Sequence, residues 1–172
     1  MDTIHTMKSI INQRIHIAPV GFEIDRVVIP AVEMKADLVY LVVHDNLSAD
    51  KAQNHHAEIQ KQLKKKKIKT ETVYANRFKL FDIIRVVKEL IEKNRTDSFY
   101  VNVASGSKIH AIGCMMACMM FDNRDNIQPF YPQPTEYPDY GEGEQQTYGV
   151  EEIHELPTYQ LLTPKPHLLA AL

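Results

Sequence analysis

The residues best suited to chemistry form a short turn in the middle of the chain, Ala104-Ser105-Gly106-Ser107-Lys108. Gly106 allows the backbone to approach a ligand closely, and Ser105 and Ser107 supply hydroxyl groups. Lys108 adds a positive charge, and the helix expected after it offers free N–H groups and the positive end of its dipole. These groups together are typical of a site for a phosphate-bearing ligand.

A second turn, Pro19-Val20-Gly21-Phe22, also places a glycine between an apolar run and a helical pattern. Neither turn is a known nucleotide motif. Ser-Gly-Ser-Lys lacks the P-loop order of glycine, lysine and serine or threonine, and the first turn has one glycine where the dinucleotide fingerprint has three. The structural alternative is that Ser105 only caps the following helix and Gly106 only permits the turn.

The elements that position these turns follow from hydrophobic periodicity. Leu38–Val43 is continuously apolar, as in a strand buried on both faces, whereas Ile68–Tyr74 alternates, as in an edge strand. The predicted strands are Arg14–Ala18, Leu38–Val43, Ile68–Tyr74, Ser98–Ala104 and Ile127–Tyr131. The predicted helices are Phe22–Lys35, one that Ser48 or Asp50 caps and that runs into Lys64–Lys67, then Phe78–Lys93 and Ile109–Phe121.

Two of these helices carry specific expectations. Pro30 is expected to kink or split the first one, because proline lacks the N–H that continues a helix. In Phe78–Lys93 the apolar side is expected to hold Phe81, Ile84, Val87 (or Lys88) and Ile91.

Strand and helix alternate up to residue 131 with short connections, which predicts a doubly wound, mostly parallel, Rossmann-like α/β sheet of order 3-2-1-4-5. In that order strands one and four are neighbours at the topological switch point, where ligands bind beyond the carboxyl ends of the strands. The two glycine-bearing turns are therefore expected to meet.

The composition changes between residues 125 and 132. Residues 1–125 hold 19 of the 20 Lys and Arg but 15 of the 22 acids, and seven of the nine prolines lie beyond residue 125. We expect a disordered or leader segment at 1–13, a Rossmann-like domain at 14–132, and a Pro/Gly/acid-rich extension at 133–172 that leads toward a missing C-terminal domain. Strands are expected within the extension at Tyr148–His154 and Leu156–Leu162, and a helix is expected to start at Leu168–Leu172.

The predicted helix Ile109–Phe121 is apolar on every side, so it cannot have a solvent-facing surface. One side must cover the sheet, and the other must be covered by the extension or by a second subunit. We therefore expect a homodimer that buries this helix or its neighbour Phe22–Lys35.

The net charge and the cysteine, histidine and lysine residues argue against several classes of function. A net charge of −2 does not indicate a nucleic-acid binder. Cys114 and Cys118 form no disulfide framework and are expected to be core or interface thiols of a cytoplasmic protein without a membrane span. His55-His56 and Lys64–Lys67 are expected to be solvated helix surface rather than a metal or nucleic-acid site. We expect no metal and no cofactor, and no catalytic triad or carboxylate pair is evident.

Three segments together resemble CARF domains, the CRISPR-associated Rossmann folds, and especially those of archaeal regulators that carry a C-terminal winged helix. The segments are Arg14-Ile-His-Ile-Ala-Pro-Val-Gly-Phe-Glu, Asp37-Leu-Val-Tyr-Leu and Val101-Asn-Val-Ala-Ser-Gly-Ser-Lys. The last is similar to the family's Asn-x-Thr-Gly-Gly-Thr-Lys-like turn, with matching residues at Asn102, Ser105, Gly106, Ser107 and Lys108.

The resemblance implies a homodimer that binds a cyclic oligoadenylate, most often the tetra-adenylate, across its two-fold axis. The dimer would pass the signal to a winged-helix DNA-binding domain absent from this chain, so DNA would be reached only through that domain. The implied ligand-binding residues are Pro19, Val20, Gly21, Phe22, Asn102, Ala104, Ser105, Gly106, Ser107 and Lys108.

Two alternatives remain open. Some CARF domains are metal-independent ring nucleases that cleave their ligand with a lysine in the fourth-strand turn and a serine in the first. Lys108 matches that lysine, but the first turn has no serine, which counts against cleavage. The other alternative is a ligand-free dimerisation module.

Overall fold

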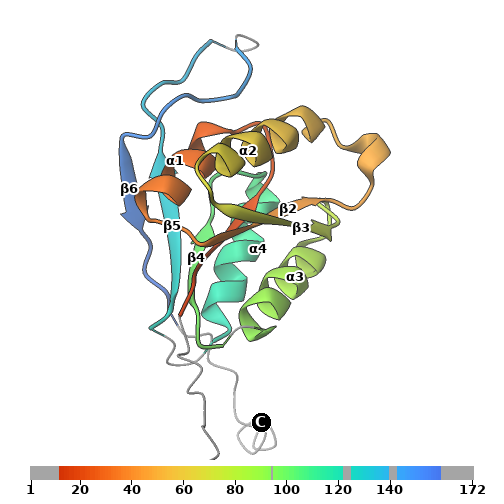
Figure 1. Ribbon diagram of the computed structural model, residues 1–172. Coiled ribbons are helices and arrows are strands. Elements are labelled where there is room, and N and C mark those ends of the chain that lie inside the picture. Colours follow the sequence, from red (N-terminus) through yellow and green to blue (C-terminus); the bar gives the residue numbers. More distant parts are fainter. Residues whose placement is uncertain (1–11, 94, 122–124, 140–142, 160–172) are drawn as a thin grey trace, which may run out of the picture.

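One six-stranded sheet forms the centre of the computed structural model, which describes residues 12–93, 95–121, 125–139 and 143–159 (Figure 1). The strands are β1 (Arg14–Pro19), β2 (Leu38–His44), β3 (Lys69–Ala75), β4 (Ser98–Asn102), β5 (Ile127–Gln133) and β6 (Glu152–Glu155). Their order is β3-β2-β1-β4-β5-β6, with β1 to β5 parallel and β6 antiparallel to β5. The predicted order 3-2-1-4-5 is confirmed, with β3 at one edge, and β6 extends the other edge.

Helices cover both faces of this sheet (Figure 1). They are α1 (Asp25–Glu33), α2 (Gln53–Lys65), α3 (Leu80–Lys93) and α4 (Lys108–Met119), with a short 3-10 helix η1 (Leu47–Ala49) before α2. The core under α1 and α2 contains Val39 and Leu41 of β2, and the core under α3 and α4 contains their neighbours Tyr40 and Val42. The alternation within β2 explains why the whole strand is apolar: each face meets a different helical layer.

Two local expectations about the helices are wrong, and part of a third. Pro30 lies inside α1 without splitting it. Phe81 is 80% exposed, because the buried side of α3 begins at Ile83. Neither Ser48 nor Asp50 caps α2, whose N-cap position is Ala52 without a side-chain cap. The Asp50 carboxylate instead accepts the N–H of Ala52 itself at 3.0 Å, directly before the helix.

The helix α4 is buried on one side only. Cys114, Ala117 and Cys118 pack into the core, whereas Ile112 is 50% exposed and lies on an outer stripe with Ile109 and Met120. The described part of the extension does not bury this stripe. No helix within the described residues has both the length and the hydropathy to cross a membrane.

The described part of the extension folds back onto the domain. After β5 the chain passes over the beginning of α1, where Glu136 and Tyr148 form an antiparallel bridge, and returns as β6 (Figure 1). The strand expected at Tyr148–His154 is therefore the shorter β6. Residues 156–159 form no strand, and 160–172, like 1–11, lie outside the described residues.

Candidate functional site

The two glycine-bearing turns meet at the carboxyl ends of β1 and β4, as expected from the strand order. The Ser105 hydroxyl donates a hydrogen bond to the Pro19 carbonyl oxygen at 2.7 Å, and Ser105 is fully buried. The turn after β4 is thus joined directly to the turn after β1. This hydroxyl is a structural donor, and it is not free to bind a ligand.

Both glycines are required by the close approach of the turns to one another. A Cβ on Gly21 would lie 2.8 Å from the Ser105 carbonyl oxygen and 3.3 Å from the Gly106 Cα. A Cβ on Gly106 would lie 2.7 Å from the Pro19 Cβ. Any side chain at either position would force the turns apart. The glycines therefore maintain the shape of this surface, a reason that the sequence interpretation did not include.

Ser107, rather than Ser105, caps α4. Its hydroxyl oxygen accepts the His110 N–H at 3.4 Å, and its own N–H donates to Nδ1 of His110 at 3.1 Å. Burial lowers the pKa of His110 to about 4, helped by the nearby Arg77 and His44, so the ring is neutral at neutral pH and Nδ1 can accept. His110 is a supporting residue that the sequence interpretation missed.

Lys108 is the exposed residue of the fourth-strand turn. It is the first residue of α4, so its N–H and that of Ile109 belong to the first helical turn, where no preceding carbonyl is available to accept them. An ammonium group and two free amides at a helix start can bind an anion. The residues around it are less accessible: Pro19, Val20 and Gly21 are buried, and Phe22 and Ala104 are half-buried.

Asn102 faces the protein interior, not solvent, and is 1% exposed. Its Nδ2 donates to the Arg26 carbonyl oxygen at 2.8 Å, and its Oδ1 accepts the Ala104 N–H at 2.9 Å. Pro30 explains this bond, because it lacks the N–H that would otherwise bind the Arg26 carbonyl within α1. Asn102 thus completes the hydrogen bonding of α1 and ties that helix to the fourth-strand turn.

The extension binds the segment directly after the first turn. Gln145 is 9% exposed, and its side-chain oxygen accepts the N–H groups of Ile24 and Asp25 at 2.7 and 2.8 Å. The Gln146 N–H donates to the Phe22 carbonyl at 2.8 Å. Because α1 has no cap from its own N-cap residue, Gln145 supplies that cap from more than 100 residues away.

A buried ion pair lies beneath these contacts. The Arg26 Nη1 is 3.3 Å from the Glu23 Oε1, and both residues are less than 10% exposed. Thr147 donates to the other Glu23 oxygen from its N–H at 3.2 Å and its hydroxyl at 2.7 Å. Burial raises the pKa of Glu23, and the Thr147 and Arg26 hydrogen bonds oppose that rise. The Arg26 guanidinium also lies 4.8 Å from the centre of the Tyr131 ring.

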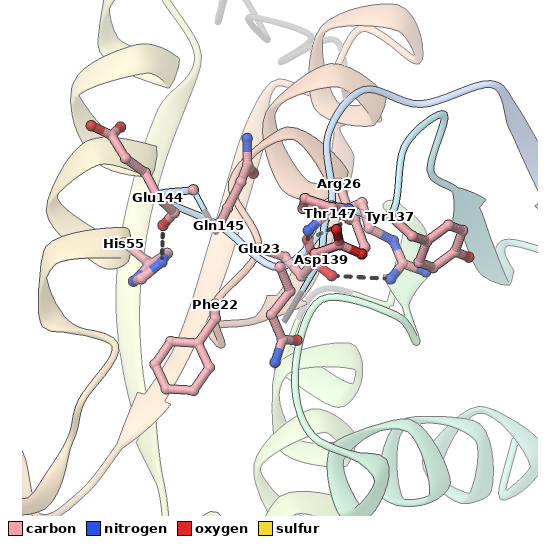
Figure 2. A pocket seen from close by; sticks show the side chains of 12 residues that line it. Phe22, Glu23, Arg26, His55, Tyr137, Asp139, Glu144, Gln145 and Thr147 are labelled. Atoms are coloured by element: carbon pink, nitrogen blue, oxygen red, sulfur yellow. Dashed lines mark hydrogen bonds and ion pairs between the residues drawn. The ribbon is translucent and has the colours of Figure 1, made fainter. Parts of the chain in front are cut away.

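A cavity of about 660 Å³ opens between the first turn, α1, α2 and the extension (Figure 2). We call it the loop–extension pocket. Its lining residues are Phe22, Glu23, Arg26, His55, Tyr137, Pro138, Asp139, Gly143, Glu144, Gln145, Gln146 and Thr147. Of the residues expected to bind ligand, only Phe22 lines it. The extension supplies most of the lining, and neither its composition nor its spacing indicated this.

The two histidines of α2 are not solvated surface, contrary to expectation. The His55 Nε2 is 2.7 Å from the Glu144 carbonyl oxygen, and the His56 Nε2 is 3.0 Å from the Thr72 hydroxyl. Both are half-buried. Among the described residues, no group of three His, Cys, Asp or Glu side chains could hold a metal ion. Cys114 and Cys118 are core thiols, and burial raises the pKa of Cys118 to about 12.

Solved structures of other proteins share the fold of this chain. Can2 from Sulfobacillus thermosulfidooxidans, in complex with cyclic tetra-adenylate, superposes with a TM-score of 0.53 at 15% identity, over 69% of this chain and 32% of that one. Csm6 from Enterococcus italicus, bound to cyclic hexa-2′-fluoro-hexa-dAMP, gives 0.57 at 12% identity, over 77% and 36%. The protein VC1899 from Vibrio cholerae gives 0.57 at 16% identity, over 78% and 36%.

Sequence comparison gives a relative and a family. The uncharacterized protein MJ1513 of Methanocaldococcus jannaschii is 33% identical in an alignment of 129 positions, which covers 70% of this chain and 38% of the relative. The chain therefore corresponds to well under half of the relative's length. A family model described as "HFX_2341_N:-like, N-terminal" matches residues 14–137, from β1 through both turns into the extension. The chain, with its CARF-like fold, belongs to this family.

Proposed function

We propose that this domain senses a cyclic oligoadenylate, with cyclic tetra-adenylate as the first candidate, on the surface where the turns after β1 and β4 meet. The observation that carries the proposal is the junction of the two turns at the switch point of the sheet, with exposed Lys108 and the first amides of α4 beside it. Can2 and Csm6, which share the fold, are bound to cyclic oligonucleotides in their structures.

The residues of the site divide into two roles under this proposal. Lys108, the amides that begin α4 and the half-buried Phe22 and Ala104 contact the ligand. Ser105, Gly21, Gly106 and Asn102 hold the turns in place, as do Pro19 and Val20. Ser107 acts through the cap that orients the first turn of α4.

A homodimer is the second part of the proposal. Ile109 and Ile112 of α4, with Met120 directly after it, form an exposed apolar stripe. The helix begins at the fourth-strand turn. Pairing two such stripes would bury them and bring two copies of the turn toward a common axis, which suits a ring with repeated phosphates. Ligand binding would then favour one arrangement of the dimer.

The third part concerns the output of the sensor. The relative MJ1513 is more than twice as long as its matching region, and we propose that the equivalent part of this protein is a winged-helix DNA-binding domain. The extension is suited to connect the two, because it binds the segment after the first turn and then continues through β6. We expect ligand binding without cleavage, since the first turn offers no hydroxyl group.

Titration calorimetry with cyclic tetra-adenylate tests the site. Lys108→Ala removes one charge-assisted contact, worth roughly 1.5–3 kcal/mol, or about ten- to hundredfold in affinity. Lys64→Ala is the matched control: it removes the same charge from an exposed lysine in the last turn of α2, at the opposite end of the sheet. Equal affinity of the parent and Lys108→Ala would refute the site, and linear products on chromatography would identify a ring nuclease instead.

A further inference from the structure

The loop–extension pocket has aromatic side chains on opposite sides. Figure 2 shows Phe22 and His55 on one side and Tyr137 on the other, with Glu23, Arg26 and Thr147 between them. The Phe22 and His55 rings contact each other edge to face, with centres 5.3 Å apart. Tyr137 is 69% exposed, so most of its ring surface is free for a stacking partner.

The charge of the lining disfavours the phosphate of a nucleotide but not its base. Among the described residues that line the pocket, three are acidic, Glu23, Asp139 and Glu144, and one is a cation, Arg26. Like charges within a few ångströms repel, so a phosphate group would be disfavoured here. A neutral, planar heterocycle meets no such repulsion and can stack on the aromatic rings.

Arg26, which lines the pocket, also has a buried hydrogen-bond donor without an acceptor. Arg26 uses its Nε for the Pro132 carbonyl at 2.8 Å and its Nη1 for Glu23. Its Nη2 is buried and has no hydrogen-bond partner among the described residues. Buried donors are normally satisfied, so this group indicates a missing acceptor. Ring nitrogens and carbonyl oxygens of a nucleobase are such acceptors.

We propose that the loop–extension pocket binds a nucleobase, specifically an adenine ring, stacked against Tyr137 and Phe22 with Arg26 as a donor to it. This inference rests on the proposed function, because it places one base of the cyclic oligoadenylate in the pocket while the phosphates lie at Lys108. Phe22 belongs to both surfaces, since it ends the first turn and lines the pocket. Base recognition would then involve the extension, which supplies Tyr137.

The absence of tryptophan from the chain allows a direct test. Tyr137→Trp introduces a single fluorophore at the pocket, and its emission should be quenched when adenosine 5′-monophosphate or cyclic tetra-adenylate stacks on it. Tyr159→Trp is the matched control, because Tyr159 is 73% exposed and does not line the pocket. Ribose 5-phosphate, which lacks the base, should quench neither variant. Equal quenching by ribose 5-phosphate and the adenine nucleotide would overturn the inference.

Affinity measurements separate this inference from the proposed function. Tyr137→Ala should weaken cyclic tetra-adenylate binding about 5- to 150-fold, the range for loss of one stacked base, whereas Tyr137→Phe should retain parent affinity. Unchanged affinity of Tyr137→Ala would overturn the pocket and leave the sensor intact. If the parent binds no cyclic oligoadenylate, the proposed function fails. Quenching of Tyr137→Trp by adenosine 5′-monophosphate would then still support the pocket, and its absence would overturn both.

Discussion

Replacement of Gln145 by alanine should release the extension from the beginning of α1. The Gln145 side chain is buried and accepts two backbone N–H groups, of Ile24 and Asp25, at 2.7 and 2.8 Å. Loss of a helix N-cap costs about 0.5–2 kcal/mol, and a buried donor left without an acceptor costs about 1–3 kcal/mol. Water entering the space left by the side chain would satisfy part of the loss. We therefore expect the free energy of unfolding to fall by about 2 kcal/mol.

Urea unfolding followed by far-ultraviolet circular dichroism measures this difference. For a domain of this size, about 2 kcal/mol corresponds to a decrease in Tm of roughly 4–8 °C. Hydrogen exchange provides a local measurement, because the Ile24 and Asp25 amides should exchange faster in Gln145→Ala. The control is Gln146→Ala, whose exposed side chain is lost while its backbone N–H keeps its bond to the Phe22 carbonyl. Equal unfolding free energies for the two variants would refute the capping role.

Three further perturbations follow from buried or exposed groups. His16 and His110 both have a pKa lowered to about 4 by burial, so the unfolded chain binds more protons below pH 6.5. The free energy of unfolding should therefore be highest above pH 6.5 and fall toward pH 4. Urea unfolding at pH 5 should show a loss of about 2 kcal/mol per histidine. Gly21→Ala would set a Cβ 2.8 Å from the Ser105 carbonyl oxygen, and should lower stability by about 1–3 kcal/mol in thermal unfolding. Ile112→Glu should convert the proposed dimer to monomer in light scattering.

A specific result would contradict each of the predictions about pH, Gly21 and the dimer. Unfolding free energies that do not change between pH 7 and 5 would contradict the effect of the two buried histidines on stability. His16→Phe, which keeps a ring beside Tyr100 and Phe130, should reduce the pH slope by about half. Parent-like stability of Gly21→Ala would show that the turns can separate. A parent protein that is monomeric at micromolar concentration would contradict the dimer before any variant is made.

Local patterns determined the secondary structure and much of the topology. Continuous apolar runs, alternation in residues 68–74 and short connections predicted a mostly parallel sheet with five strands in the order 3-2-1-4-5. That order predicted that the turns after β1 and β4 meet. These predictions succeed because strand burial, helix periodicity and crossover connections depend on residues close together in the sequence.

The function of individual side chains was decided by contacts between distant segments. Asn102 has a polar side chain that could contact a ligand. In the structure it instead binds the Arg26 carbonyl oxygen, which Pro30 leaves without an N–H partner in α1. Gln145 has no local signature of a cap, because the helix that it caps begins 120 residues earlier. Phe81 fits the apolar period of α3, but the rotation of that helix on the sheet leaves it in solvent.

The loop–extension pocket is the clearest example of a feature that depends on contacts between distant segments. The sequence indicated a change of composition near residue 130, which separates the extension from the domain in charge and proline content. Only the folded chain brings Tyr137, Gln145 and Thr147 back against Phe22 and Arg26. Hydrogen bonds across more than 100 residues carry no periodic signal, since each needs only one donor and one acceptor at the right place in three dimensions.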